Sequence, residues 1–278
     1  MKQRIIFLDI DGTLTLPGTN APPESAIRAV ARARSEGHLV FLCTGRNYDM
    51  LRPLLKYEFD GFIASMGGYI ECQGKAIYDC PMTESQRRSA MEVLEKNNVF
   101  RTVECMDGSY TDDGLKEFLH IHAAEGNNSE LLRLRKQIEK ELHILPMREY
   151  QGQPVYKILV MSRSEAQLSE PKTVLNRDFY FCMQEKSTHG FINGEIVNRK
   201  FDKGKAICRV CSHLHIPIED SVAFGDSMND REMLEAAGLG ICMEDGSDGL
   251  KKCADDICPG VQNDGIRRAF LKYGLMHE

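Results

Sequence analysis

Three short apolar runs constrain the fold of this chain more than any other feature of its sequence. Apolar and polar residues do not alternate within these runs, which is typical of strands that are buried on both faces of a parallel sheet. The runs are Ile5–Leu8, Leu39–Cys43 and Ser221–Phe224. Between the first two, Ile27, Val30 and Ala31 recur at helical spacing behind Pro22-Pro23, a favourable helix start. The sequence therefore predicts βαβ units and an α/β fold with a doubly wound, Rossmann-like parallel sheet.

A polar cluster follows each of these runs directly. The clusters are Asp9–Thr13, Thr44–Arg46 and Gly225–Asp230. Residues that follow parallel strands gather along the carboxyl edge of the sheet, where ligands bind. We therefore expect the three clusters to form one crevice.

The middle of the chain has an α/β pattern of its own. Thr83 with Gln86 forms a capping-box pattern before a helix that is expected to reach about Asn97. Strand-like runs follow at 100–106, 155–161 and 178–183, and apolar residues at helical spacing are Leu115, Phe118, Leu119, Leu131, Leu134 and Ile138. We therefore predict a catalytic core formed by residues 1–82 and 190–278, with an inserted α/β cap domain at 83–189.

Composition excludes several classes of protein. The net charge of −6 argues against a nucleic acid or an anionic membrane as a partner held by bulk charge. No apolar run approaches the ~18 residues that a membrane helix needs, and the apolar start is too short for a signal peptide. The ten cysteines are then expected to be reduced thiols, and the expected location is the cytoplasm.

The clusters are rich in carboxylates. Asp9, Asp11 and Asp226 would repel one another in one crevice unless a hard cation neutralised them, and a set of oxygen ligands suits Mg²⁺. Because Mg²⁺ commonly shares the oxygens of a substrate phosphate, the pattern predicts a phosphorylated ligand. Lys203, near the start of a helix, would supply positive charge, and the Thr44 hydroxyl and nearby backbone N–H groups would donate to phosphate oxygens.

Asp9 and Asp11 also suggest a reaction. Asp11, two residues after Asp9, points the same way on an extended backbone. The pair offers a nucleophile beside a general acid. A carboxylate that attacks phosphorus divides hydrolysis into two displacements through an acyl phosphate.

These motifs closely resemble the haloacid dehalogenase superfamily, and specifically its Cof-like hydrolases with an α/β cap. The signature Asp-x-Asp-Gly-Thr matches Asp9–Thr13, and Thr-Gly-Arg matches Thr44–Arg46. Asp-Lys-Gly-Lys-Ala matches 202–206, and Gly-Asp-x-x-Asn-Asp matches Gly225–Asp230. The resemblance spans nearly the whole chain and implies a phosphatase of small phosphorylated metabolites.

The resemblance also implies roles. Asp9 matches the nucleophile that becomes aspartyl phosphate and also binds Mg²⁺. Asp11 matches the general acid and base, with its backbone carbonyl on the metal. Asp226 matches the third metal ligand, and Asp230 matches a carboxylate that orients metal-bound water. The positions that match phosphate contacts are Thr44, Gly45, Lys203 and Asn229.

Two loops depart from the family pattern. Met66-Gly67-Gly68 stands where relatives commonly have Asn-Gly-Ala, and Met243-Glu244-Asp245-Gly246 is more acidic than usual. The contacts that relatives make near these two loops are therefore not assigned to this chain.

Several alternatives remain open from the sequence. A phosphosugar mutase of the same superfamily would use the same aspartates, and a binding protein would keep the pocket without turnover. Lys205 competes with Lys203, Arg46 either binds substrate or supports the cap, and His189 is a candidate substrate contact. Cys208 and Cys211 share a helix face, for which core packing is expected rather than a metal site.

Overall fold

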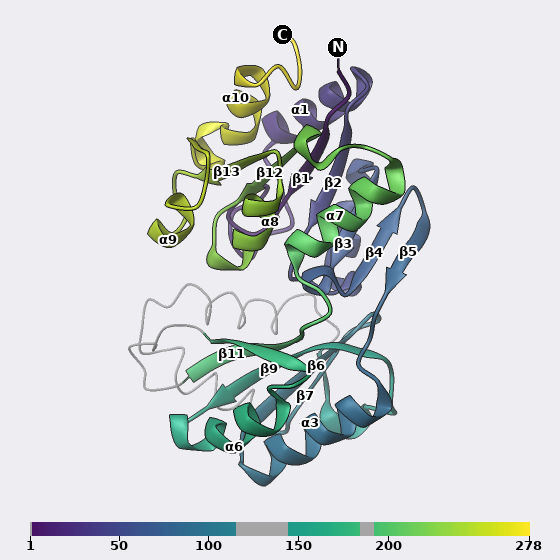
Figure 1. The fold of residues 1–278 in the computed structure, drawn as a ribbon, viewed down its shortest axis with the longest axis vertical. Helices are drawn as coiled ribbons and strands as arrows, with labels where there is room; N and C mark the ends of the chain where they lie inside the picture. Colours follow the sequence, from purple (N-terminus) through teal and green to yellow (C-terminus); the bar gives the residue numbers. More distant parts are fainter. Residues whose placement is uncertain (1, 115–143, 184–191) are drawn as a thin grey trace. The chain divides into compact units, whose positions relative to one another are not determined.

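The computed structural model describes residues 2–114, 144–183 and 192–278. The chain divides into two compact units (Figure 1). The core unit comprises residues 1–46, 51–79 and 201–278, and the cap unit comprises residues 47–50 and 80–200. Within the described ranges, no helix combines the length and the apolar character that a membrane span requires. The helices predicted around Leu115 and Leu131, and His189, lie outside the described residues.

The described part of the core unit contains an eight-stranded sheet in the order β14-β13-β12-β1-β2-β3-β4-β5. Six of its strands are parallel, and β4 and β5 are antiparallel. The strands are β1 (Ile5–Leu8), β2 (Leu39–Cys43), β3 (Gly61–Ala64), β4 (Tyr69–Cys72), β5 (Lys75–Asp79), β12 (Ser221–Gly225), β13 (Leu239–Met243) and β14 (Asp256–Cys258). The predicted doubly wound α/β sheet is thus confirmed.

Register places the ends of the three central strands at one level. Leu8 of β1 lies beside Leu42 of β2 and beside Phe224 of β12. Every residue of β1 is buried, as its unbroken apolar sequence predicts. The polar residues that come next in each segment therefore emerge together at the carboxyl edge of the sheet.

Helices cover both faces of the core sheet. On one face, α7 (Lys203–Leu214) and α8 (Arg231–Ala236) pack against Phe7, Phe41 and neighbouring apolar residues (Figure 1). On the other, α1 (Glu24–Ser35) and α10 (Gly265–Lys272) contact each other, and Phe224 packs against Phe270 of α10. The shorter core elements are η1 (Arg52–Tyr57), η2 (Ser65–Gly67), η4 (Ile218–Asp220), η5 (Met228–Asp230), α9 (Asp248–Lys251) and η6 (Val261–Asn263). The short helix α2 (Tyr48–Leu51) belongs to the cap unit except for its last residue.

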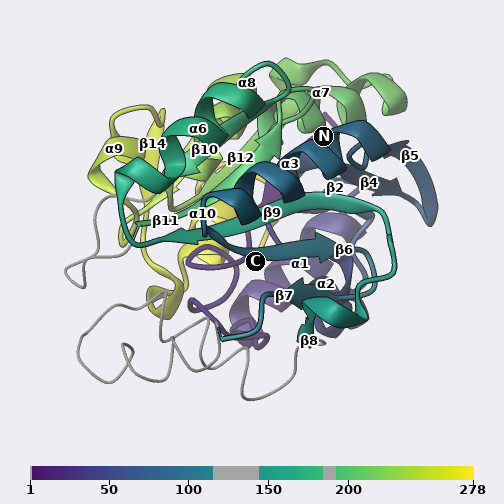
Figure 2. The same ribbon diagram turned by 90° about the horizontal axis from the view of Figure 1, so that it is seen from below.

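The described part of the cap unit contains a six-stranded sheet in the order β10-β11-β9-β6-β7-β8. Its strands are β6 (Phe100–Cys105), β7 (Ser109–Thr111), β8 (Ile144–Pro146), β9 (Val155–Ser162), β10 (Phe179–Met183) and β11 (Ile192–Asn198), with η3 (Met147–Glu149) after β8. Helices α3 (Glu84–Lys96) and α6 (Glu165–Leu175) contribute to one apolar cluster with the sheet (Figure 2). The capping box is present: Thr83 Oγ1 accepts from the Gln86 N–H at 3.2 Å, and the Gln86 side chain accepts from the Thr83 N–H at 3.1 Å.

Candidate active site

The predicted site residues of the core unit emerge at the carboxyl edge of its sheet. The Asp9 N–H extends the ladder after β1 by donating to the Phe224 carbonyl at 3.0 Å. The Thr44 N–H does the same after β2, donating to the Ile63 carbonyl at 2.9 Å. Asp226 follows the last residue of β12. The three polar clusters thus meet at one edge because their strands are adjacent and in register.

Lys203 lies at the centre of the site. It is the first residue of α7, and its side chain is fully buried. Its Nζ donates to Asp9 Oδ1 at 2.7 Å and to Asp230 Oδ1 at 2.5 Å. Burial alone would lower the pKa of Lys203, but the charges of Asp230 and Asp9 outweigh it and raise that pKa, so the ammonium stays charged. The rival Lys205 is half exposed and pairs with Asp202 at 2.9 Å.

Asp230 organises the loop after β12. Its Oδ1 accepts from Lys203, and its Oδ2 accepts from the backbone N–H groups of Asp226 at 3.0 Å and Ser227 at 3.1 Å. The side chain is fully buried, and a Cβ added to Gly225 would lie 2.5 Å from it. Both oxygens of Asp230 are therefore used in holding Lys203 and the Asp226 backbone in place.

Three carboxylates crowd around one point. Asp9, Asp226 and Asp230 each offer an oxygen, and these atoms lie within 4.8 Å of one another. Burial, together with the neighbouring carboxylates, raises the pKa of Asp9 to about 7 and that of Asp226 to about 8. A bound cation would relieve this repulsion, and the oxygen-only donor set fits a hard ion such as Mg²⁺. Because Asp230 is already engaged, Asp9 and Asp226 are the side chains best placed to hold it.

Asp11 is held by Arg46. The Arg46 Nε donates to Asp11 Oδ2 at 2.8 Å, and Nη2 donates to Asp11 Oδ1 at 2.8 Å. Asp11 Oδ1 also accepts from the Gly18 N–H at 3.0 Å. The role of Arg46 was open from the sequence, and its pairing with Asp11 was not predicted. The one available signal was that both residues belong to motifs that reach the same sheet edge.

The predicted phosphate contacts have different surroundings. Thr44 is buried, and its Oγ1 accepts from the Arg46 N–H at 3.2 Å. Gly45 is partly buried, while Asn229 is exposed, and its Oδ1 accepts from Ser227 Oγ at 2.9 Å. Their contact with a phosphate remains a prediction.

The loop after β3 forms a tight turn with three successive residues at positive φ: Ser65 (49°), Met66 (61°) and Gly67 (102°). The Ser65 N–H donates to the Arg46 carbonyl at 2.8 Å, and the Met66 N–H donates to the Thr44 carbonyl at 3.0 Å. A Cβ on Gly67 would lie 2.7 Å from the Asp202 carbonyl oxygen. The departure from Asn-Gly-Ala therefore still yields a turn that supports the Thr44 segment and the start of α7. Glu244 and Asp245, in the second unusual loop, are exposed.

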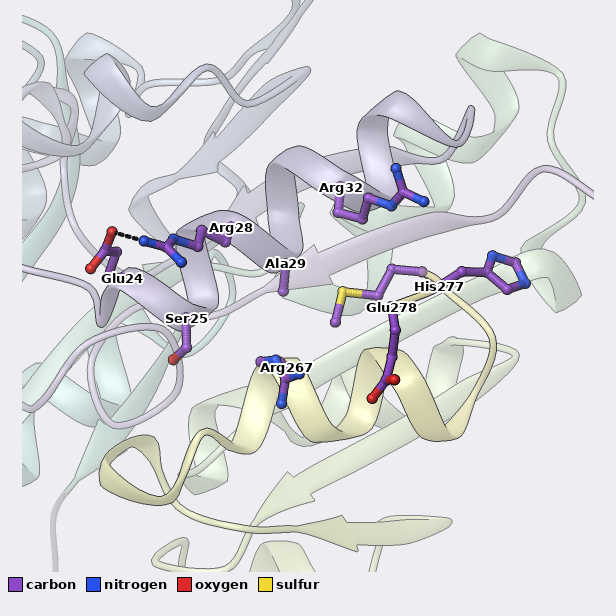
Figure 3. Close-up of a pocket in the computed structure, with 9 residues that line it drawn as sticks. Glu24, Ser25, Arg28, Ala29, Arg32, Arg267, His277 and Glu278 are labelled. Atoms are coloured by element: carbon purple, nitrogen blue, oxygen red, sulfur yellow. Dashed lines mark hydrogen bonds and ion pairs between the residues drawn. The ribbon is translucent and has the colours of Figure 1, made fainter.

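A separate groove of about 590 Å³ lies between α1 and α10 (Figure 3). Arg28, Arg32 and Arg267 line it, and it includes none of the predicted site residues. Arg28 pairs with Glu24 within α1, and Arg32 pairs with Glu36 at 2.7 Å. Because none of the carboxylates of the three motifs lines it, this groove is not the candidate active site.

Comparison with known proteins agrees with the motifs. A family model described as haloacid dehalogenase-like hydrolase matches residues 6–270. YkrA of Bacillus subtilis is 28% identical over 99% of this chain and 100% of its own length. The pyridoxal phosphate phosphatase YbhA of Escherichia coli is 28% identical over 98% of this chain and 99% of its own length.

A solved structure has the same fold. The crystal structure of a hypothetical protein from Geobacillus kaustophilus HTA426 superposes with a TM-score of 0.80 at 25% identity, covering 99% of this chain and 100% of that chain. The predicted resemblance and the predicted enzyme class, a phosphatase, are thereby confirmed. The chain belongs to the haloacid dehalogenase-like hydrolase family.

Proposed function

We propose that the protein is a Mg²⁺-dependent phosphatase that hydrolyses phosphomonoesters of small metabolites through an aspartyl phosphate on Asp9. The observation that carries the proposal is the buried position of Asp9, 2.7 Å from the Lys203 ammonium and crowded by Asp226 and Asp230. An aspartate held by a fixed cation at the carboxyl edge of a parallel sheet has the surroundings of a nucleophile.

In the first step, an oxygen of Asp9 attacks phosphorus, and the bond from phosphorus to the leaving oxygen breaks. Asp11, protonated with the release of one of its bonds to Arg46, gives this proton to that oxygen, which departs as an alcohol. In the second step, Asp11 takes a proton from a water molecule, whose oxygen attacks the same phosphorus and releases Asp9 and phosphate. One residue thus acts first as an acid and then as a base.

The remaining groups position Asp9 and the phosphate and stabilise the negative charge between them. Lys203 holds Asp9 in a fixed orientation, and the Thr44 hydroxyl, the Gly45 N–H and the Asn229 amide would bind phosphate oxygens. Asp9, the Asp11 backbone carbonyl and Asp226 would hold Mg²⁺, with Asp230 fixing the loop behind Asp226. When bound, Mg²⁺ supplies positive charge that offsets the negative charge gathered on the phosphoryl group.

We further propose that the cap unit selects the substrate. All the predicted catalytic, metal and phosphate-binding residues lie in the core unit, so the core alone offers little to distinguish one leaving group from another. The relative YbhA is named for pyridoxal phosphate, which makes that compound the first candidate to test, together with sugar phosphates, nucleotides and flavin mononucleotide.

The test measures phosphate release from this panel by the purified protein with Mg²⁺. Asp9→Asn is the blank, because an amide does not attack phosphorus. Asp220→Asn is the matched control: Asp220 is a buried carboxylate that directly precedes β12, at the opposite end of that strand from Asp226. We expect release by the unchanged protein and by Asp220→Asn but none by Asp9→Asn. Equal release by Asp9→Asn would contradict the proposal.

A further inference from the structure

The Asp11–Arg46 pair is built more firmly than an ordinary surface ion pair. Two parallel N–H···O bonds of 2.8 Å join the guanidinium to both carboxylate oxygens. The exposed fraction of the side chain is 3% for Arg46 and 12% for Asp11. Bidentate pairs of this kind fix the relative orientation of their planes as well as attracting each other.

Arg46 is itself anchored on the opposite side. Its Nη1 donates to Asn20 Oδ1 at 2.6 Å, and its Nη2 also donates to the Thr19 carbonyl at 3.1 Å. The loop that follows Asp11 thus wraps around the guanidinium, and the Gly18 N–H of the same loop returns to Asp11 Oδ1. The position of the Asp11 carboxylate is therefore set jointly by Arg46 and by its own loop.

We infer that Arg46 is a positioning residue for the reaction: it orients the Asp11 carboxylate for proton transfer and acts on catalysis only through Asp11. The inference rests on the proposed function, in which Asp11 exchanges protons with the leaving oxygen and with water. Loss of the two Arg46 bonds would leave the orientation of the carboxylate less well defined, and a misplacement of about 1 Å in a reacting group costs about 100-fold in rate.

The chain offers a matched control for the loss of such a pair. Arg34 joins Asp60 through the same two atoms, with Nε and Nη2 each 3.0 Å from a carboxylate oxygen. Asp60 precedes β3, at the amino end of that strand, whereas the site lies at the carboxyl edge. Arg34→Gln removes a bidentate pair from the same unit without touching the site.

The experiment compares Arg46→Gln, Arg46→Lys and Arg34→Gln with the unchanged protein on two monoesters with Mg²⁺. The alkoxide leaving group of β-glycerophosphate needs a proton in order to depart. The 4-nitrophenolate of 4-nitrophenyl phosphate departs without being protonated. We expect Arg46→Gln to lower kcat on β-glycerophosphate by about 10- to 100-fold with little change in KM, and to lower it less on 4-nitrophenyl phosphate. Arg46→Lys should retain only part of the kcat on β-glycerophosphate, because an ammonium lacks the planar two-donor fork of a guanidinium. Arg34→Gln should keep the kcat of the unchanged protein.

A double-mutant cycle on 4-nitrophenyl phosphate decides whether Arg46 acts through Asp11. If it does, Asp11→Asn with Arg46→Gln should be no slower than Asp11→Asn alone. Two results would overturn the inference while leaving the proposed function intact. One is a double variant that is slower than Asp11→Asn by the same factor that Arg46→Gln alone causes. The other is an equal loss of kcat in Arg46→Gln on both esters. No turnover of either ester by the unchanged protein would instead contradict the proposed function and the inference with it.

Discussion

The α-carbon of Gly12 faces the carboxylate of Asp226 so closely that a Cβ at Gly12 would lie 2.4 Å from Asp226 Oδ2. Gly12 also has a φ of +87°, a conformation that residues with a Cβ rarely adopt. The glycine of the first motif thus makes room for the carboxylate of the last. The two motifs, far apart in the sequence, fit together only with glycine at this position.

Gly12→Ala should therefore displace Asp226 and lower kcat by about 100-fold, since misplacing a reacting constellation by about 1 Å costs that much. Gly74→Ala is the control, because Gly74 has a φ of +76° but nothing within 4 Å of an added Cβ. Steady-state kinetics and urea unfolding of both variants separate the two effects. Equal kinetic losses in both would show that backbone strain, and not the contact with Asp226, is responsible.

Lys203→Met should destabilise the protein by about 3–5 kcal/mol, because removal of Lys203 leaves the buried Asp9 and Asp230 carboxylates without their shared cation. Lys205→Met should change the free energy of unfolding by less than about 1 kcal/mol, since Lys205 is half exposed. Urea denaturation without metal measures both. A loss in Lys203→Met as small as that in Lys205→Met would mean that the buried pair contributes little.

Removal of divalent ions with EDTA should abolish turnover, and Mg²⁺ should restore it. Because the pKa of Asp9 is about 7 and that of Asp226 about 8, protons compete with the ion near neutral pH. Mg²⁺ affinity, measured by calorimetry, should therefore rise as the pH increases from about 6 to about 8. Asp226→Asn should weaken binding, and Asp220→Asn should not. Affinity that is independent of pH and unchanged in Asp226→Asn would place the ion elsewhere.

Folding stability should fall on acidification in part because of His38. This side chain is 2% exposed, its Nδ1 accepts from the Arg4 N–H at 3.0 Å, and burial lowers its pKa below the ordinary 6.5. Below pH 6.5 the unfolded chain therefore takes up a proton that the folded chain resists, so stability is lost as the pH falls. The loss from this residue is at most about 1.4 kcal/mol per pH unit.

His38→Asn, which keeps an acceptor near the Arg4 N–H, should reduce this loss between about pH 7 and pH 5. Nearby Glu36 raises the pKa of His38, and His277 bonds to Glu36; both side chains are present in the two proteins that are compared. His213→Asn is the control, because His213 is exposed. An unchanged acid dependence in His38→Asn would exclude a contribution from this histidine.

The parts of the fold that depend on local pattern could be predicted from the sequence. The unbroken apolar runs identified β1, β2 and β12, and the parallel arrangement that they imply placed the polar clusters at one edge. The strand β11 was missed because Asn193-Gly194 reads as a turn. It forms because it pairs with both β9 and β10, a context that overrides local propensity.

Features that depend on packing in three dimensions were less predictable. On α1 the buried residues are Ala26, Ala29, Val30 and Ala33, whereas Ala31 is exposed, so the predicted apolar face was partly wrong. The expectation that Cys208 and Cys211 both pack in the core was wrong for Cys208, which is exposed. Likewise, the Arg46 partner depends on side-chain directions at the sheet edge, which spacing in the sequence does not determine.

Covalent catalysis requires that Asp9 becomes phosphorylated during turnover. Its most direct test is acid quench of the protein during a single turnover, followed by peptide mass spectrometry. We expect a mass gain of one phosphoryl group on the peptide that contains Asp9, absent from Asp9→Asn and present in Asp220→Asn. Turnover without phosphorylation of any residue, or phosphorylation of a different aspartate, would contradict it.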